Sequence, residues 1–434
     1  MVRSVWQRDC SLPEHPPLTG EIRTGVLVIG GGLAGLLTAW TLRQHGVDVV
    51  LVEKDRICSA TTAHTTAKIT AQHGLIYHKL LRSIGAEGAS QYYRANTEAV
   101  EQLKKLCRQF GVPIEEKANF VYSCSRQKLG EELAALQKLH IPAIFNEAPP
   151  LPLSTAGAVG IAGQAQFHPL KLAEHLAKEL TIYEHTKVTE LIGTTAKTEH
   201  GNVRAEKIVV STHFPFLNKH GSYFLKLYQH RSYLLGLENA GRLDAMYVSD
   251  EKKGMSFSSF GDTLLLGGGG HRTGKQGGGW RELWEFADRH YPDAIETAHW
   301  AAQDTMSLDG IPYIGHYSRN TPDLYVAAGF NKWGMTGSMV SAMVLADLIR
   351  GKEHGYAEIF DPSRSILKPQ LLLNCIETTA SFLLPTTKRC PHLGCALKYN
   401  PEEHSWDCGC HGSRFSQSGK VLDNPANDDH KGIS

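Results

Sequence analysis

An apolar run, a glycine turn and a helical pattern open the ordered part of the chain. Residues 26–30 (VLVIG) predict a buried strand, and 33–46 (LAGLLTAWTLRQHG) predict a helix that ends at Gly46. Residues 47–53 (VDVVLVE) predict a second buried strand. A strand, a helix and another strand in this order are typical of a parallel βαβ unit.

The later pattern predicts more helices and strands, followed by a change of character. Residues 75–140 are rich in helical periodicity, for example EAVEQLKKLCRQFG and EELAALQKLH, and MVSAMVLADLIRG predicts a late helix that ends at Gly351. Further strands are expected in AEKIVVST, TLLLGGGG and DLYVAAG. Beyond residue 365 the chain becomes richer in Cys, His, Pro and Asn. We therefore expect one oxidoreductase-sized unit over 1–365, a linker over 366–385 and a small module over 386–434.

Composition excludes several classes of protein. With 41% hydrophobic and 21% charged residues, the 434-residue chain can bury a large core. The formal net charge of +1 argues against a nucleic-acid-binding surface. The longest apolar stretch, 371–385, is interrupted by Asn374 and Glu377, so no membrane span is expected. The first residues contain no apolar signal region, and we expect a cytoplasmic protein.

The glycine turn has the spacing of a dinucleotide-binding fingerprint. Gly30 allows the tight turn, Gly32 lets the backbone approach a pyrophosphate, and Gly35 allows the helix to pack closely on the strand. Phosphates would lie at the helix N-terminus, beside Leu33 and Ala34, where free N–H groups favour negative charge. Glu53 ends the second strand, where an acid would bind ribose hydroxyls. A purely structural glycine turn is the alternative.

The chain resembles the FAD-dependent amino-acid and amine oxidase superfamily, which includes D-amino-acid, glycine and sarcosine oxidases. The resemblance rests on the single fingerprint and on AQFHPLKLAEHLA, KVTEL, NVRAEKIVVST, DTLLLGGGGHRTG, DGIPYIG and DLYVAAGFNKWGMTGSMVSAMVLADLIRG. It implies an α/β fold in which a Rossmann-like FAD-binding domain is interleaved with an antiparallel-sheet substrate domain. It also implies FAD contacts at Val188, where a backbone group meets the adenine, and along the late loop and helix start: Gly329, Gly334, Met335 and Thr336.

A threonine-rich segment follows Glu53. CSATTAHTTAK resembles the flavin phosphate loop of a narrower branch of the family, and its hydroxyls could reach the diphosphate or ribityl chain: Thr61, Thr62, Thr65 and Thr66. Singly, each threonine is also an ordinary turn residue. His64 fits a packing or capping role better than a flavin tether or a base. His213 stands where many relatives have a small Ala-Thr-Gly turn.

Four of the nine cysteines fall within the last part of the chain, beside histidines. Cys390-Pro-His392 and Cys408-Gly-Cys-His411 each pair one thiolate with one imidazole. A zinc finger usually groups like ligands together, whereas mixed pairs suit a Rieske [2Fe–2S] centre, with two cysteines on one iron and two histidines on the other. A zinc site and the absence of any metal remain the alternatives.

The sequence CPHLGCALKYN…SWDCGCHGSRF…SGK resembles both Rieske boxes. The resemblance implies that Cys390 and Cys408 bind the inner iron, and His392 and His411 the outer one. It further implies a disulfide between Cys395 and Cys410, as in cytochrome-complex Rieske proteins, and a hydroxyl contact to the cluster from Ser413. The departures from the pattern are Phe415 in place of a tyrosine, Gly409 in place of a proline, and a covering proline loop reduced to 424–426. The module is also short, so it is expected to need support from the flavin domain.

These features together predict an FAD-dependent dehydrogenase or oxidase. Its substrate would be a small amine or amino-acid-like molecule with a CH–NH bond, and electrons would pass from the flavin to the cluster and on to an unidentified acceptor. The alternatives are an oxidase that uses O2 and carries a vestigial module, and a redox sensor or electron carrier without turnover. No catalytic base is predicted; the candidates for the substrate site are Tyr77, Arg231, His271, Arg272, Lys332 and Trp333.

Overall fold

The computed structural model describes residues 3–433. A largely parallel sheet combines strands from residues 20–52, 181–210 and 313–328. β1 pairs in parallel with β2 and β10, and Val26 lies opposite Val49 and Lys207. The order is β16-β17-β10-β1-β2-β7, with the hairpin β8–β9 joined to β10. The bounds are β1 (Gly20–Ile29), β2 (Val49–Val52), β7 (Thr181–Tyr183), β8 (Val188–Ile192), β9 (Thr195–Thr198), β10 (Gly201–Val210), β16 (Tyr313–His316) and β17 (Leu324–Ala328).

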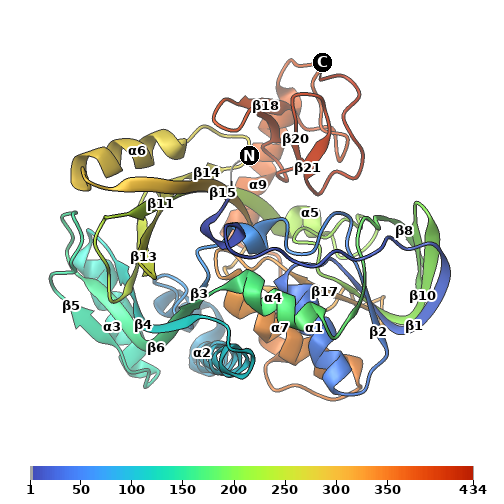
Figure 1. Ribbon diagram of the computed structural model, residues 1–434, viewed down its shortest axis with the longest axis horizontal. Coiled ribbons are helices and arrows are strands. Elements are labelled where there is room, and N and C mark those ends of the chain that lie inside the picture. Colours follow the sequence, from blue (N-terminus) through green and yellow to red (C-terminus); the bar gives the residue numbers. More distant parts are fainter. Residues whose placement is uncertain (1–2, 434) are drawn as a thin grey trace.

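A second, mostly antiparallel sheet stands beside the first (Figure 1). Its order is β15-β11-β14-β13-β12-β4-β6-β3, with β5 on β6, and only β12 and β4 pair in parallel. The bounds are β3 (Lys68–Ile69), β4 (Ile114–Tyr122), β5 (Ile144–Asn146), β6 (Ala158–Phe167), β11 (Leu227–Glu238), β12 (Met246–Ser249), β13 (Ser256–Phe260), β14 (Thr263–Arg272) and β15 (Ile295–Ser307).

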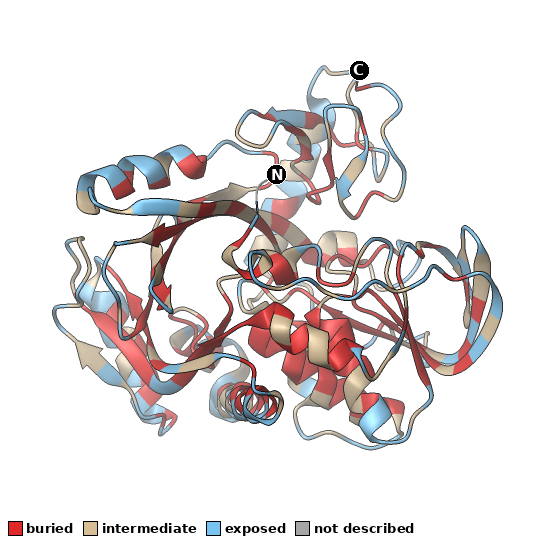
Figure 2. Cartoon of the chain, in the orientation of Figure 1, coloured by how far each residue is buried: buried red, intermediate tan, exposed pale blue. Residues whose placement is uncertain are grey.

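Apolar helices fill the space around the parallel sheet (Figure 2). α1 packs against α7, and the contact buries Leu36, Leu37, Ala342 and Leu345 completely. Because both helices are apolar on nearly every side, they lie in the interior rather than at the surface. The bounds are α1 (Leu33–Gln44), α2 (Tyr77–Phe110), α3 (Arg126–Lys138), α4 (Pro169–Ala177), α5 (Tyr223–Lys226), α6 (Gly279–His290), α7 (Gly334–Ile349), α8 (Ala357–Phe360), α9 (Pro369–Leu383) and the 3-10 turns η1 (Val5–Gln7) and η2 (Thr61–His64).

The C-terminal module is a small four-stranded sheet with its own core. Its strands are β18 (Leu397–Asn400), β19 (Ser405–Cys408), β20 (Arg414–Phe415) and β21 (Val421–Asp423). The segment expected as a linker contains α9, whose Ser381 hydroxyl accepts the Ala396 N–H of the module. The module (red in Figure 1) lies beside α9 and against the rest of the chain. No helix of residues 3–433 has the length and apolar character needed to cross a membrane.

Candidate functional site: two cavities and a cysteine–histidine centre

The glycine turn between β1 and α1 has the close packing that its spacing predicts. Gly30 has φ +110°, and a Cβ atom on Gly35 would lie 1.9 Å from the Gly30 carbonyl oxygen. Any side chain at Gly35 would therefore push α1 away from the strand. The Glu53 carboxylate accepts the Gly31 N–H at 2.6 Å and the Asp55 N–H at 3.0 Å, which holds the turn against the end of β2.

A long cavity extends from this turn. Gly30, Gly32, Leu33 and Ala34 line it on one side, and Glu53 lies at the end of β2. Three other elements also line it: η2 with Thr61 and Thr62, the start of β8 with Val188, and the start of α7 with Gly334 and Met335. We call it the dinucleotide cavity. The Thr62 hydroxyl accepts the Leu33 N–H at 3.0 Å, so η2 is bonded to the first turn of α1.

Of the residues predicted to contact FAD in the segment 329–336, only some line this cavity. Gly334 and Met335 line it, whereas the Thr336 side chain is directed elsewhere. The Thr336 hydroxyl accepts the Thr70 N–H at 2.9 Å and donates to the Thr70 carbonyl at 3.1 Å. Gly329, with φ +71°, lies at the turn after β17, where a Cβ atom would meet the Leu227 side chain at 3.0 Å. Gly329 and Thr336 therefore shape the loop and helix start.

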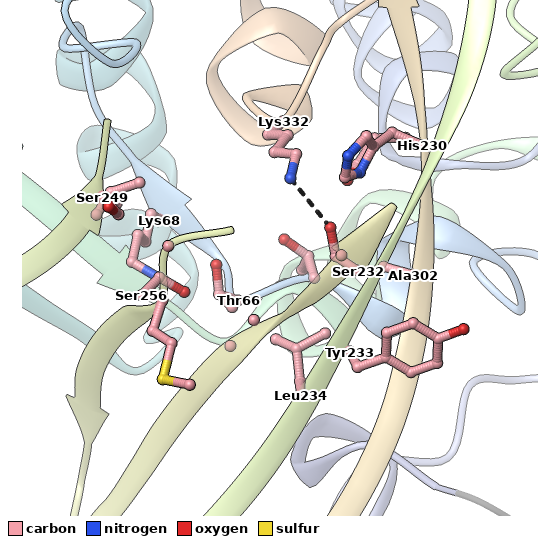
Figure 3. Close-up of a pocket in the computed structure, with 18 of the residues that line it drawn as sticks. Thr66, Lys68, His230, Ser232, Tyr233, Leu234, Ser249, Ser256, Ala302 and Lys332 are labelled. Carbon is pink, nitrogen blue, oxygen red and sulfur yellow. Dashed lines mark hydrogen bonds between the residues drawn. The ribbon is translucent and has the colours of Figure 1, made fainter. Parts of the chain in front are cut away.

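A second cavity adjoins the first, and Met335 lines both (Figure 3). Thr65 and Thr66 lie here, so the threonine-rich segment is shared between the two cavities. Lys332 and Trp333, two of the predicted substrate-site residues, also line the second cavity. We call it the substrate cavity. The Lys332 ammonium donates to the Ser232 hydroxyl at 3.2 Å, as the dashed line in Figure 3 shows.

Several ionisable side chains meet in the substrate cavity. Burial, reinforced by the nearby Lys117, lowers the pKa of Lys68 to about 7. Burial raises the pKa of Asp304 to about 6, although Lys332 and Arg231 act in the opposite direction. Lys68 forms no ion pair with a carboxylate of residues 3–433. Below about pH 7, Lys68 therefore carries a charge without a carboxylate partner in residues 3–433, and it can pair with an anionic group of a ligand.

His230 is a further ionisable group of the cavity. Burial and the nearby Lys332 and His271 lower its pKa to about 2, so its imidazole is neutral at physiological pH. Burial and Arg231 also lower the pKa of His64, which lines the same cavity. Neither ring contributes a positive charge near neutral pH.

The other predicted substrate-site residues point away from the cavity. Arg231 forms a buried ion pair with Glu403 of the module. Arg272 donates to the Gly409 and Cys410 carbonyls, each at 3.3 Å. Both guanidinium groups are thus occupied at the contact with the module, so these two candidates have structural roles and do not line the substrate cavity. Tyr77 donates to the Ala71 carbonyl and His271 bonds to the Tyr233 hydroxyl at 3.0 Å.

The four predicted metal ligands converge at one edge of the C-terminal module. The rings of His392 and His411 lie 5.0 Å apart between centroids, and the Nδ1 atom of each is buried without a hydrogen-bond partner in residues 3–433. A buried imidazole nitrogen without a hydrogen-bond partner is available to coordinate a metal ion. Burial lowers the pKa of His392 to about 4 and that of His411, with help from His392 and Arg272, to about 3. Both rings are thus neutral and able to act as ligands at neutral pH.

The two ligand cysteines lie beside each other. A hydrogen bond with Cys390 lowers the pKa of Cys408 to about 7; burial opposes this shift, and the backbone N–H groups of residues 410–412 add to it. Amide donors of this kind stabilise a thiolate or a cluster sulfur. The Ser413 hydroxyl acts against the rise in the pKa of the Cys390 thiol, and its expected contact with the cluster stays a prediction. This donor set fits a [2Fe–2S] centre with mixed ligands.

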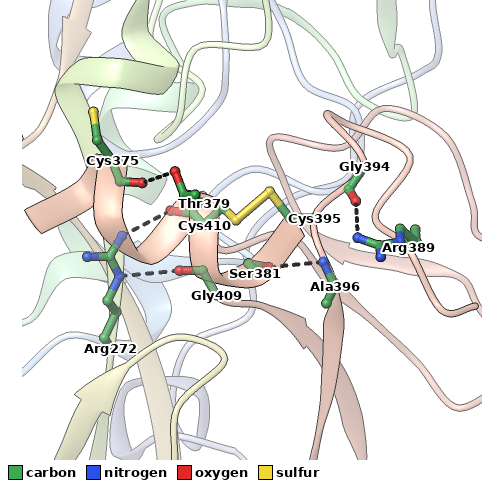
Figure 4. The surroundings of a disulfide bond; sticks show 10 residues. All are labelled: Arg272, Cys375, Thr379, Ser381, Arg389, Gly394, Cys395, Ala396, Gly409 and Cys410. Carbon is green, nitrogen blue, oxygen red and sulfur yellow. Dashed lines mark hydrogen bonds between the residues drawn. A yellow bond between two sulfur atoms is a disulfide. The ribbon is translucent and has the colours of Figure 1, made fainter. Parts of the chain in front are cut away.

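A disulfide joins the two ligand-bearing loops (Figure 4). It links Cys395 to Cys410, which confirms the pairing implied by the Rieske resemblance. The Cys408 sulfur lies within 4.8 Å of both disulfide sulfurs. Since a disulfide sulfur is no thiolate ligand, this grouping of three cysteines is not a metal site of its own, and Cys408 is left to act with Cys390. Arg272 reaches the same loop through its bonds to Gly409 and Cys410.

Two consecutive residues connect the dinucleotide cavity with the histidine pair. His213, just beyond β10, lines the cavity. The ring of the next residue, Phe214, stands edge-on to both His392 and His411, at 6.4 Å between centroids in each case. The sequence marked His213 only as a departure from the family pattern and did not mark Phe214. No local signal could have found this pair, because its partners are about 180 residues away along the chain.

A second connection runs through Gln303 on β15. Its amide donates to the Gly412 carbonyl of the cluster loop at 2.9 Å. Its own backbone carbonyl accepts the Thr61 hydroxyl, which lines the dinucleotide cavity, at 3.3 Å. Two separate sets of contacts therefore join the cysteine–histidine centre to the wall of the dinucleotide cavity.

Comparison with known proteins identifies the chain. The family model "FAD dependent oxidoreductase" matches residues 25–348. The chain belongs to this family. The Rieske [2Fe-2S] domain model matches residues 378–433. YhfW of Bacillus subtilis is named as a Rieske 2Fe-2S iron-sulfur protein. It is 33% identical in an alignment of 490 positions, gaps included, which covers 98% of this chain and 96% of the relative.

Solved structures support the same fold. Glycine oxidase from Geobacillus kaustophilus superimposes with a TM-score of 0.68 at 20% identity, covering 79% of this chain and 99% of that one. L-proline dehydrogenase from P. horikoshii gives a TM-score of 0.67 at 19% identity, covering 80% and 98%. The predicted fold class, the FAD-dependent oxidoreductase assignment and the two cofactors, FAD and a Rieske [2Fe–2S] cluster, are confirmed.

Proposed function

We propose that this oxidoreductase oxidises a small amine or amino-acid-like substrate and delivers the electrons, one at a time, to its Rieske cluster. Oxidation of a CH–NH bond to C=N releases two electrons and two protons. FAD supplies the chemistry that accepts two electrons together and releases them singly, and the cluster carries one electron at a time. The electrons leave for a one-electron acceptor outside the chain, and the protons go to water.

The dinucleotide cavity is the proposed FAD site. Gly30, Gly32, Leu33 and Ala34 would hold the diphosphate at the N-terminus of α1, where unpaired N–H groups favour negative charge, and Gly35 would let α1 pack closely enough on β1. The residues proposed to bind the rest of the cofactor are Glu53 for the ribose, Thr61, Thr62, Thr65 and Thr66 for the diphosphate and ribityl chain, Val188 for the adenine, and Gly334 and Met335 beside the ring. Gly329 and Thr336 would support the ring indirectly, by shaping the loop and the helix start.

The substrate cavity is the proposed site of amine binding. Lys68, with no carboxylate partner in residues 3–433, would pair with the carboxylate of an amino-acid-like substrate. Asp304 and Lys332 would orient the amino group and its proton, because both line the same cavity. The likeness of the fold to glycine oxidase and L-proline dehydrogenase, two proteins named for amino-acid substrates, supports this class.

The observation that carries the electron-transfer part is the position of the histidine pair. His392 and His411 face Phe214 of the flavin domain, and the preceding residue, His213, lines the FAD cavity. This contact between the outer ligands and the wall of the flavin site supports the proposal that the two centres exchange electrons.

Anaerobic rapid mixing tests this function. Oxidised protein is mixed with a panel of amines and amino acids, while flavin absorbance and the electron paramagnetic resonance signal of the reduced cluster are followed. We expect the flavin to bleach first and the cluster signal to appear afterwards in the wild type. In His411→Ala we expect the flavin to bleach without any cluster signal.

The controls separate the alternatives. If His411→Ala turns over with O2 as fast as the wild type and the wild-type cluster stays oxidised throughout, the protein is an oxidase with a structural module. If no substrate of the panel bleaches the flavin although dithionite reduces both centres, the result favours a redox sensor or an electron carrier without turnover. Lys68→Met, with Lys252→Met at the rim as the matched control, then tests the substrate cavity.

A further inference from the structure

The C-terminal module forms part of the wall of the dinucleotide cavity. One side of this cavity belongs to the glycine turn and the ends of the parallel strands, as described above. Another part of its lining comes from the residues after the second cluster loop. These are Lys420, Val421, Leu422, Asp423, Asn424, Ala426, Asn427 and Asp429. We call residues 420–429 the closing segment.

Specific hydrogen bonds hold the closing segment against the flavin domain. The Asn424 side-chain amide donates to two backbone carbonyls, those of Thr212 and Phe214, both at 2.7 Å. The Lys187 ammonium, next to Val188 at the predicted adenine end, donates to the Asn427 carbonyl. The segment is therefore attached both at the end of β10 and at the beginning of β8. Removal of the Asn424 side chain would remove both of these bonds, while the Thr212 carbonyl would keep the Phe214 N–H and the Phe214 carbonyl would keep the Thr212 hydroxyl.

The same segment is bonded to the cluster loops. The Ala426 N–H donates to the Ser413 hydroxyl at 3.0 Å, and the Ser413 carbonyl accepts the N–H of the ligand Cys408 at 2.8 Å. Asp423 forms an ion pair with Arg414 at 2.9 Å, at the base of the module. The wall of the dinucleotide cavity and the support of the cluster are thus one continuous piece of chain.

We infer that the closing segment retains the dinucleotide: FAD is held between the glycine turn and residues 420–429, and it dissociates only when the module moves away. A ligand enclosed between two walls leaves at the rate at which one wall opens. This role is independent of electron transfer, because it depends on contacts and not on the redox state of the cluster. It assigns the Rieske module a binding function for the cofactor of the other domain.

The test measures FAD release from the purified holoenzyme. Asn424→Ala removes both bonds of its amide, whereas Asp428→Ala alters an exposed residue of the same segment that is outside the cavity lining. FAD release is followed by the rise of flavin fluorescence after dilution. We expect release from Asn424→Ala to be about tenfold faster than from the wild type, the effect of losing two neutral hydrogen bonds. Asp428→Ala should match the wild type.

Iron content and the cluster signal of each variant show whether the module is still folded. With an intact cluster, an unchanged rate of FAD release in Asn424→Ala would overturn the inference. If Asn424→Ala loses its cluster, Lys187→Met, which removes the attachment at the other end, replaces it in the same assay. A variant that releases FAD rapidly but still transfers electrons while the flavin is bound supports the inference and leaves the proposed function intact. Normal FAD retention in a variant with an intact cluster counts against the inference whatever the rate of electron transfer, whereas a wild-type cluster that stays oxidised after the flavin is reduced counts against the proposed function.

Discussion

The backbone of Gly274, just beyond β14, lies directly against that of Gly409 in the second cluster loop. A Cβ atom on Gly274 would stand 2.4 Å from the Gly409 nitrogen, a distance that real Cβ atoms do not reach. The neighbouring bonds from Arg272 to Gly409 and Cys410 lie at the same contact. The module is therefore attached to the flavin domain by close approach of two chains as well as by side chains.

Gly274→Ala should loosen this contact. Gly274 has φ +75°, so an alanine there is strained in its backbone and also meets the cluster loop. Gly46 has the same φ of +75° with nothing near its Cβ position, and Gly46→Ala is the matched control for backbone strain alone. We expect faster hydrogen exchange in residues 408–412 of Gly274→Ala than of Gly46→Ala. Equal exchange in both variants would mean that the contact does not hold the module.

The disulfide should slow the loss of the cluster. Cys395 and Cys410 are separated by 15 residues, and closing a loop of this length stabilises a fold by about 3 kcal/mol. We expect the double variant Cys395→Ser/Cys410→Ser to lose iron to a chelator at least tenfold faster than the wild type. Cys375→Ser, which changes an exposed free cysteine on α9, should not differ from it. Similar rates for the double variant and the wild type would contradict a stabilising role.

Arg414 should be essential for the stability of the module. It is buried and pairs with Glu403, Asp407 and Asp423, at 2.6, 3.1 and 2.9 Å. Replacement by methionine leaves these carboxylates with too few cations, and such a change commonly destabilises a protein by about 3–5 kcal/mol. Arg319→Met, at an exposed position, is the control. Denaturant unfolding of the module, followed by the cluster absorbance, measures the difference, and a loss below about 1 kcal/mol would not fit this network.

Binding of a carboxylate in the substrate cavity should weaken as the pH rises through about 7. Burial and Lys117 lower the pKa of Lys68 to about 7, so its ammonium is present below that pH and is lost above it. A simple carboxylate probe is benzoate, and its binding is measured by isothermal titration calorimetry. We expect its Kd to rise with pH between about 6 and 8 in the wild type.

Two variants check that Lys68 is the group responsible. Lys68→Met should bind benzoate weakly at every pH in this range, and Lys68→Arg should keep its affinity to higher pH because a guanidinium stays protonated. Lys252→Met, at the rim, should behave as the wild type. A Kd that changes with pH in the same way in Lys68→Met would assign the titration to another group, such as Asp304.

The sequence by itself determined the features that depend on neighbouring residues. The turn at Gly30, Gly32 and Gly35 needs three glycines at close spacing, because the backbone there must bend and pack closely. The pairs Cys390–His392 and Cys408–His411 needed only the right donors at short intervals. Both were therefore readable without knowing how the chain folds, as were the family and the two cofactors.

Only the tertiary structure decided how the two redox modules meet. Arg231 and Arg272 were among the candidates for the substrate site, yet they bind the module, whereas Lys68, which carried no signal, lines the substrate cavity. Phe214 and the closing segment gain their positions from contacts across about 200 residues. Such contacts depend on how two sheets and a module pack, and the packing is set by the buried surface of the whole chain and not by any short run of residues.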